Sequence, residues 1–177
     1  MIRKIPSLKL KRIKMLLLDV DGVMTDGGIY YSNSGDEFKK FNIQDGFGIM
    51  KLQRFGIKSG IITGRVSNIV SRRAKELGIT EVHQNLDNKL LVYESLKKKL
   101  NLTDTEIAYI GDDEFDLPVL GYAGFSAAPA DAMPVVKKSV DYVCKHRGGD
   151  GAVREVIELI LHNQKDKGEP QRLPGKA

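Results

Sequence analysis

Short apolar runs recur along the chain, each bounded by polar residues or glycine. Two of them, 15–18 and 107–110, are apolar at every position, which is typical of strands buried on both faces of a parallel sheet. Shorter runs predict four more strands, at 59–62, 81–83, 124–127 and 142–143.

Helical patterns lie between these runs and carry the expected signals at their ends. The predicted helices cover 47–55, 66–77, 90–100 and 152–161, the third with Asp87 as its N-cap. Strands that alternate with helices predict a doubly wound α/β domain.

One segment interrupts this alternation. Residues 28–31 and 37–41 flank the turn-forming sequence Ser-Asn-Ser-Gly-Asp at 32–36. Together they predict a β-hairpin that projects from just past the first strand. The hairpin is too short to be a domain of its own.

Length and composition favour one ordinary globular domain. The chain has 177 residues, 41% of them hydrophobic and 29% charged. We expect the domain to cover 14–162, after a solvated basic lead-in at 1–13 and before a flexible polar tail at 163–177. The net charge of +5 suits anionic small molecules but does not form the single basic stripe of a nucleic-acid-binding protein.

The sequence also carries no membrane or secretion signal. No apolar run approaches the roughly 18 residues of a transmembrane helix, and no apolar stretch follows the basic N-terminus. Cys144 is the only cysteine, so an intramolecular disulfide is impossible. We therefore expect a cytoplasmic protein with no membrane partner and no nucleic-acid partner.

Two carboxylates, Asp19 and Asp21, follow the first predicted strand directly. Ligands bind outside the carboxyl ends of the strands in an open α/β sheet. Asp19 is ionised at neutral pH without a base and can attack phosphorus to form an aspartyl-phosphate. Asp21 projects to the same side, where it can protonate the leaving alcohol and then activate water. Gly22 permits the sharp exit from this strand.

A second acidic cluster, residues 111–116, follows the strand predicted at 107–110. Carboxylates can approach a phosphate only beside a cation, and Mg²⁺ prefers oxygen ligands. We expect Asp19, Asp112 and the backbone of the Val20–Asp21 segment to bind this ion.

The remaining acids of that cluster allow two roles. Asp113 and Asp116 are either further ligands or orient Lys89 and metal-bound water. Other interpretations stay open. Asp19 and Asp21 could instead form a capped turn, and the cluster at 111–116 could be a solvated turn or a calcium loop. An EF-hand loop is disfavoured because Gly22 comes at its fourth position rather than its sixth.

Thr63 and Lys89 are candidates to hold the phosphoryl oxygens. Thr63 follows the strand predicted at 59–62, although it could instead cap the next helix. Lys89 lies near the start of a helix, where the macrodipole disfavours cations. It therefore indicates a neighbouring anion, the alternative being a plain exposed charge.

Arg73 falls within the apolar stripe of the helix predicted at 66–77. A guanidinium on a buried side needs an anionic partner, which is either an acidic side chain or a substrate carboxylate. Arg65 opens the same helix toward the expected site.

Together these residues resemble the four motifs of the haloacid dehalogenase superfamily of phosphohydrolases. The motifs are Asp19-x-Asp21-Gly22-Val23, Thr63-Gly64-Arg65, Lys89 and Gly111-Asp112-Asp113-x-x-Asp116. The resemblance runs from about 14 to 161 and implies a Rossmann-like domain without a cap, a Mg²⁺ cofactor and a homotetramer. The sequence agrees on the cap, because only the hairpin, one helix and one strand fit between Asp21 and Thr63.

Three further segments, 21–27, 41–46 and 148–155, resemble a group of sugar-acid phosphatases within that superfamily. In this group the hairpins of four subunits associate and a neighbour helps to cover each site. The aromatic residues of the hairpin would form that contact or would pack onto their own domain: Tyr30, Tyr31, Phe38 and Phe41.

The same resemblance implies substrate contacts at Asp21, Arg65, Arg73, Lys89 and along one segment, namely Asn42, Ile43, Gln44, Asp45 and Gly46. The implied substrate is the sugar phosphate 3-deoxy-D-manno-octulosonate 8-phosphate, a lipopolysaccharide precursor. Met50 departs from relatives that carry arginine there. The alternatives are a phosphatase of a nine-carbon sialic-acid-type sugar 9-phosphate and a catalytically idle relative that acts as a scaffold.

Overall fold

The computed structural model describes residues 7–164. Six parallel strands form one sheet in the order β5-β4-β1-β6-β7-β8. The strands are β1 (Met15–Leu18), β4 (Lys58–Ile62), β5 (Glu81–His83), β6 (Ile107–Ile110), β7 (Phe125–Ala128) and β8 (Tyr142–Val143). Every strand predicted from the sequence is present, and the doubly wound α/β architecture is confirmed.

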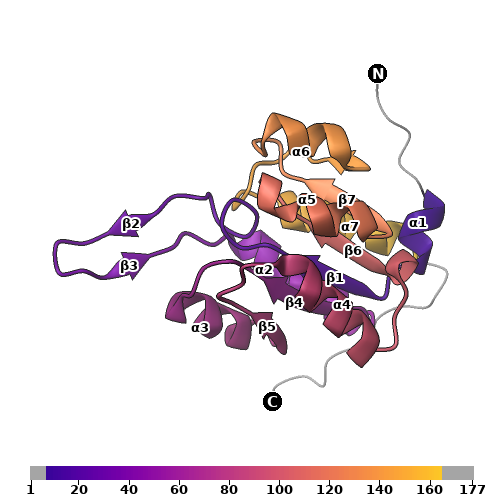
Figure 1. Cartoon of the computed structure of the whole chain (residues 1–177), viewed down its shortest axis with the longest axis horizontal. Helices are drawn as coiled ribbons and strands as arrows, with labels where there is room; N and C mark the ends of the chain where they lie inside the picture. Colours follow the sequence, from indigo (N-terminus) through magenta and orange to yellow (C-terminus); the bar gives the residue numbers. More distant parts are fainter. Residues whose placement is uncertain (1–6, 165–177) are drawn as a thin grey trace, which may run out of the picture.

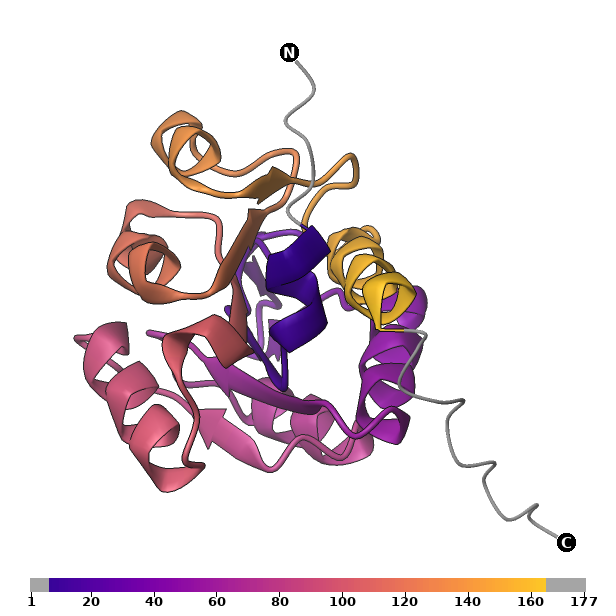
Figure 2. The same cartoon turned by 90° about the vertical axis from the view of Figure 1, so that its right-hand side faces the viewer.

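Helices cover both faces of the sheet (Figures 1 and 2). One face packs against α1 (Ser7–Arg12), α2 (Ile43–Arg54), α3 (Asn68–Glu76) and α7 (Ala152–Asn163). The other packs against α4 (Lys89–Lys99), α5 (Leu117–Tyr122) and α6 (Pro134–Ser139). Two short 3₁₀ turns, η1 (Asp104–Glu106) and η2 (Glu114–Asp116), flank β6.

The central strand β1 supplies both cores. Leu16 and Leu18 belong to the core under α2 and α7, whereas Met15 and Leu17 belong to the core under α4 and α5. All four side chains are fully buried. This explains why β1 is apolar at every position and does not alternate.

The predicted hairpin is also present and projects from one end of the body (Figure 1). It pairs β2 (Tyr30–Tyr31) with β3 (Glu37–Phe38) in antiparallel fashion. A bridge between Thr25 and Phe41 closes its base. Between Asp21 and Thr63 the structure contains this hairpin, α2 and β4, so no cap domain is inserted there.

The structure differs from the expected lead-in at 1–13. Residues from Ser7 onward form α1, and Leu10 and Ile13 are buried in the core. At the other end, the side chain of Gln164 donates hydrogen bonds to the carbonyls of Leu10 (2.8 Å) and Ile13 (2.9 Å). The first residues assigned to the tail are therefore anchored, and the rest of the expected tail lies outside the described residues.

Two predicted helix starts need correction. Helix α2 begins at Ile43 and not at 47, because the side chain of Asn42 accepts hydrogen bonds from the backbone N–H groups of Gln44 (2.7 Å) and Asp45 (3.3 Å). Helix α4 is capped by Asn88 and not by Asp87. None of the helices within residues 7–164 combines the length and the apolar character needed to cross a membrane.

Candidate active site

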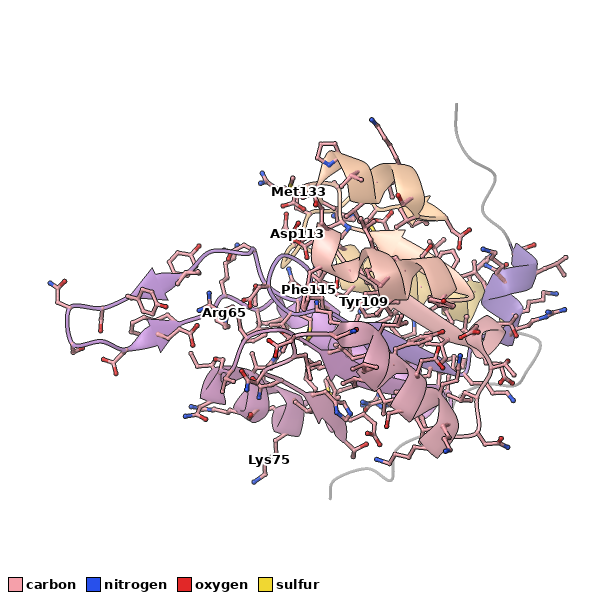
Figure 3. All side chains as sticks on the ribbon, viewed as in Figure 1. Arg65, Lys75, Tyr109, Asp113, Phe115 and Met133 are labelled. Carbon is pink, nitrogen blue, oxygen red and sulfur yellow. The ribbon has the colours of Figure 1, made fainter. Side chains whose placement is uncertain are left out.

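The segments that follow β1, β4 and β6 meet at the end of the sheet near the hairpin. They enclose a pocket of about 230 Å³ lined by Asp19, Asp21, Thr63, Gly64, Arg65, Lys89, Asp112, Asp113, Phe115 and Asp116. Arg65, Asp113 and Phe115 lie on the side of the body from which the hairpin projects (Figure 3). The four sequence motifs therefore converge in space.

Lys89 forms the electrostatic centre of this pocket. Its side chain is 3% exposed, and its Nζ lies 2.7 Å from Asp19 Oδ1 and 2.7 Å from Asp116 Oδ1. Burial alone would lower the pKa of Lys89, but the two carboxylates outweigh burial and raise that pKa. The alternative that Lys89 is an exposed charge is therefore wrong.

Asp116 holds this arrangement together. Its Oδ1 also accepts a hydrogen bond from the hydroxyl of Tyr109 (2.6 Å). Its Oδ2 accepts bonds from the backbone N–H groups of Asp112 (2.9 Å) and Asp113 (3.3 Å). Asp116 is buried with both oxygens engaged, which excludes a solvated turn at this cluster.

The donor set fits a hard divalent cation. Asp19, Asp112 and Asp116 each place a carboxylate oxygen within 4.8 Å of the others. Asp112 Oδ1 is buried and accepts no hydrogen bond, although a buried polar atom normally has a partner. A cation such as Mg²⁺ would supply the missing partner and offset the repulsion between the carboxylates.

The pKa values of Asp19 and Asp112 reflect the same crowding of carboxylates. Burial, followed by the charge of Asp116, raises the pKa of Asp19 to about 6 against the opposing effect of Lys89. Burial, followed by the charges of Asp19 and Asp116, raises the pKa of Asp112 to about 8. Protons therefore compete with any cation for this site near neutral pH.

Asp21 lies on the hairpin side of the pocket. Its carboxylate forms an ion pair with Lys39, and its Oδ2 lies 3.8 Å from Nε of Arg65. Glu37 of β3 contacts both of these cations. Its Oε1 lies 3.3 Å from Nη2 of Arg65 and 3.5 Å from Nζ of Lys39. Sequence reasoning missed Lys39 and Glu37, because alternating charges on a small hairpin look like a solvated surface.

The loop that follows β1 (residues 19–29, called the β1 loop) approaches its neighbours closely, and glycine permits this. Gly22 has φ +85°, and a Cβ at this position would collide with Asp112 Oδ2. The expectation that Gly22 shapes the exit from β1 is confirmed. A Cβ on Gly148 would collide with the carbonyl oxygen of Gly22, so the loop before α7 packs directly against the β1 loop.

Thr63 is buried at the end of β4, where its N–H donates a hydrogen bond to the carbonyl of His83 (2.9 Å). The N-cap position of α3 belongs to Ser67, so Thr63 does not cap that helix. Its side chain belongs to the pocket lining instead. Phe115, which sequence reasoning did not select, places its ring centre 5.2 Å from Nζ of Lys89.

The segment 42–46 and Arg73 lie outside the lining of this pocket. The segment is the N-cap and first turn of α2, and the carboxylate of Asp45 accepts hydrogen bonds from the N–H groups of Gly151 (3.2 Å) and Arg154 (2.7 Å). Arg73 is bonded to Glu76 (3.2 Å), but its Nε is buried without a partner. Met50 packs against the core.

Known proteins resemble this chain in sequence. A sequence profile described as haloacid dehalogenase-like hydrolase matches residues 62–157. The 3-deoxy-D-manno-octulosonate 8-phosphate phosphatase of Escherichia coli K12 is 46% identical over 153 residues, which cover 86% of this chain and 81% of that protein. The chain belongs to the haloacid dehalogenase-like hydrolases.

Two solved structures of this family extend the likeness to three dimensions. The phosphatase of the same name from Yersinia pestis has a TM-score of 0.90 and 44% identity, covering 94% of this chain and 90% of that one. The phosphatase from Moraxella catarrhalis has a TM-score of 0.88 and 45% identity, covering 90% and 92%. That structure holds a magnesium ion, a phosphate ion and a KDO molecule.

Proposed function

We propose that this protein is a magnesium-dependent phosphatase that hydrolyses 3-deoxy-D-manno-octulosonate 8-phosphate to the free sugar acid and phosphate, in the synthesis of a lipopolysaccharide precursor. One observation carries the proposal. The buried carboxylate of Asp19 lies beside the Lys89 ammonium and beside Asp112, whose Oδ1 has no partner. The relatives named for this activity support the choice of substrate.

In the first half of the reaction, a carboxylate oxygen of Asp19 attacks phosphorus to form an aspartyl-phosphate. The P–O bond to the sugar breaks, and the sugar oxygen takes a proton from Asp21. In the second half, Asp21 takes a proton from the water that attacks the aspartyl-phosphate. This water releases phosphate and regenerates Asp19.

The other residues of the pocket hold charge in place. Thr63 and Lys89 would bind the phosphoryl oxygens. Asp19, Asp112 and the backbone carbonyl next to Asp21 would hold Mg²⁺, which when bound offsets the negative charge of the phosphoryl group. We assign Asp116 to orienting Lys89 and Asp112, because both of its oxygens already accept hydrogen bonds.

Arg65 and Arg73 would recognise the sugar acid, together with the segment 42–46. Arg65 lines the pocket and is partly exposed, so it can reach a ligand. The Nη2 end of the Arg73 guanidinium lies beside Gly46, where a Cβ would collide with it, and the Nε of the same side chain is buried without a partner. Asp45 would act indirectly by fixing α2 against α7.

A substrate panel tests the function. Purified protein is assayed for phosphate release from 3-deoxy-D-manno-octulosonate 8-phosphate, a nine-carbon sialic-acid-type sugar 9-phosphate and simple hexose phosphates, each with Mg²⁺ and with chelator. We expect the eight-carbon sugar acid to be the best substrate and chelator to abolish turnover. A preference for the nine-carbon compound would change the assigned substrate to that compound. Background rates on every compound would favour a catalytically idle scaffold.

The exposed hairpin supports a homotetramer. Tyr31 is 67% exposed and Phe38 is 56% exposed, which leaves an apolar surface that a second copy could cover. Replacing both residues with serine should shift the mass measured by light scattering from four subunits toward one, whereas Leu91→Ser on α4 should not. We also assign the protein to the cytoplasm, where the buried thiol of Cys144 would stay reduced.

A further inference from the structure

We propose that Lys39 is a positioning residue, which holds the carboxylate of Asp21 in the orientation needed to protonate the leaving sugar oxygen. The inference rests on the function proposed above and extends it to a residue of the hairpin. Lys39 would not touch the substrate itself, because it lies outside the pocket lining.

The burial of Lys39 is the first observation. Lys39 follows the two-residue strand β3, and the adjacent Lys40 is exposed, yet the side chain of Lys39 is 1% exposed. A buried ammonium is unfavourable unless it is paired with acceptors. Lys39 is paired with Asp21, and its Nζ lies 3.5 Å from Glu37 Oε1. Its charge is therefore directed at the side chain that would transfer the proton.

The second observation is that Lys39 is itself fixed. Glu37 Oε2 accepts a hydrogen bond from the hydroxyl of Ser67 (2.9 Å), next to the start of α3. Arg65 donates to Glu37 Oε1 at 3.3 Å and reaches Asp21 only at 3.8 Å, with its side chain partly exposed. Lys39 is thus the closer and better-shielded of the two cations that face Asp21.

This arrangement separates two halves of the site. Asp19 is held by Lys89, whereas Asp21 is held by Lys39 and Arg65. Loss of Lys39 should therefore disturb proton donation to the leaving group and leave the attack on phosphorus intact. Such an effect depends on the leaving group, because an alkoxide needs the proton and p-nitrophenolate does not.

The experiment compares Lys39→Met, Asp21→Asn and the double variant with wild type, with the neighbouring exposed Lys40→Met as matched control. The first half of the reaction is measured alone, as single-turnover release of the sugar or of p-nitrophenol with enzyme in excess and saturating Mg²⁺, because the later hydrolysis of the aspartyl-phosphate, which also uses Asp21, is common to both substrates. We expect Lys39→Met to lower the single-turnover rate on the sugar phosphate by about 10²-fold but to change the rate on p-nitrophenyl phosphate by less than about threefold. Asp21→Asn should show the same selectivity, the double variant should be no slower than Asp21→Asn, and Lys39→Arg should restore most of the rate.

Equal losses on both substrates would overturn the proposal, since they would indicate a merely structural role. A double variant whose loss of rate is the product of the two single losses would also overturn it. The same holds if Lys39→Met is as fast as wild type on the sugar phosphate. Failure of the proposed function looks different, because the wild type itself would then not release phosphate from that compound. The comparison would then use whichever alkyl phosphate the wild type hydrolyses.

Discussion

Lys89 sets the charge balance of the pocket at the scale of single residues. One buried ammonium faces Asp19 and Asp116, while Asp112 adds a third carboxylate nearby. The site therefore carries an excess of negative charge, which is unfavourable away from water. A divalent cation or a proton must balance it, and the pKa of Asp112, raised to about 8, expresses that need.

Asp19→Asn should abolish turnover while the fold survives. The amide cannot attack phosphorus, so we expect phosphate release to fall by at least about 10³-fold. Because the Asp19 carboxylate is buried and repelled by Asp116, the neutral amide should leave the thermal midpoint without Mg²⁺ unchanged or raised. Asp87→Asn, at an exposed position before α4, is the control. Substantial activity in Asp19→Asn would refute the assignment of the nucleophile.

The convergence of the four motifs was predictable one residue at a time. Asp19, Thr63 and Asp112 each follow a buried strand, and parallel strands end at one edge. Lys89 was singled out because a cation is unfavourable at a helix start. Lys39 offered no such signal, because its burial depends on how the hairpin folds back toward Asp21.

At the scale of elements, loops carry the site and glycines let them approach. The β1 loop lies between Asp112 on one side and the loop before α7 on the other, in contact through Gly22 and Gly148. The N–H of Gly149 adds a hydrogen bond to the carbonyl of Val23 (3.0 Å). The position of the β1 loop therefore depends on a segment far away in the sequence.

Gly148→Ala should loosen this contact. The added methyl group would meet the backbone of Gly22, so that one loop must move. We expect a loss of about 1–3 kcal/mol in the free energy of unfolding, measured by urea denaturation. We also expect a lower kcat, because the position of Gly22 relative to Asp112 would change.

The matched control is Gly121→Ala in α5, where an added Cβ would have no neighbour within 4 Å. Alanine is the better helix former, so this variant should gain about 0.5–1 kcal/mol and keep its activity. Equal behaviour of the two variants would mean that the contact between the two loops is unimportant.

Sequence patterns predicted the sheet strands and the longer helices but missed the short helices. Helices α5 and α6 have six residues each, with proline in the first turn, and pack through Val119, Leu120 and Val136. So few residues show no helical period, and only tertiary packing stabilises them. The first turn of α2 was hidden by Gly46 and Gly48, which are poor helix formers but admit the side chains of Arg73 and Arg154.

At the scale of the whole molecule, fold and site share the central strand. β1 is paired with β4 and β6 and supplies both cores, and Asp19 follows its last residue directly. The carboxylate that we propose attacks phosphorus is thus attached to a rigid part of the protein. Asp21, two residues later, depends instead on the hairpin that projects from the body.

Stability should therefore respond to pH and Mg²⁺ together. The pKa values of Asp19 and Asp112 are raised from 3.8 to about 6 and about 8, so the folded protein without metal binds protons more tightly than the unfolded chain. By linkage, the resulting stabilisation is complete below the unfolded value and is lost as pH rises through the two folded values. Because Mg²⁺ needs the deprotonated acids, its own stabilising effect should grow over the same range.

Thermal unfolding with and without Mg²⁺ between about pH 5.5 and about pH 8.5 measures both trends. We expect the two midpoints to differ little at the acid end and by several degrees at the alkaline end. Asp112→Asn should remove most of that difference, since it lacks the acid with the higher pKa and a proposed metal ligand. Asp87→Asn, at an exposed acid outside the pocket lining, is the control and should keep the difference. A Mg²⁺ effect that is the same at every pH would contradict the assignment of the cation to these two carboxylates.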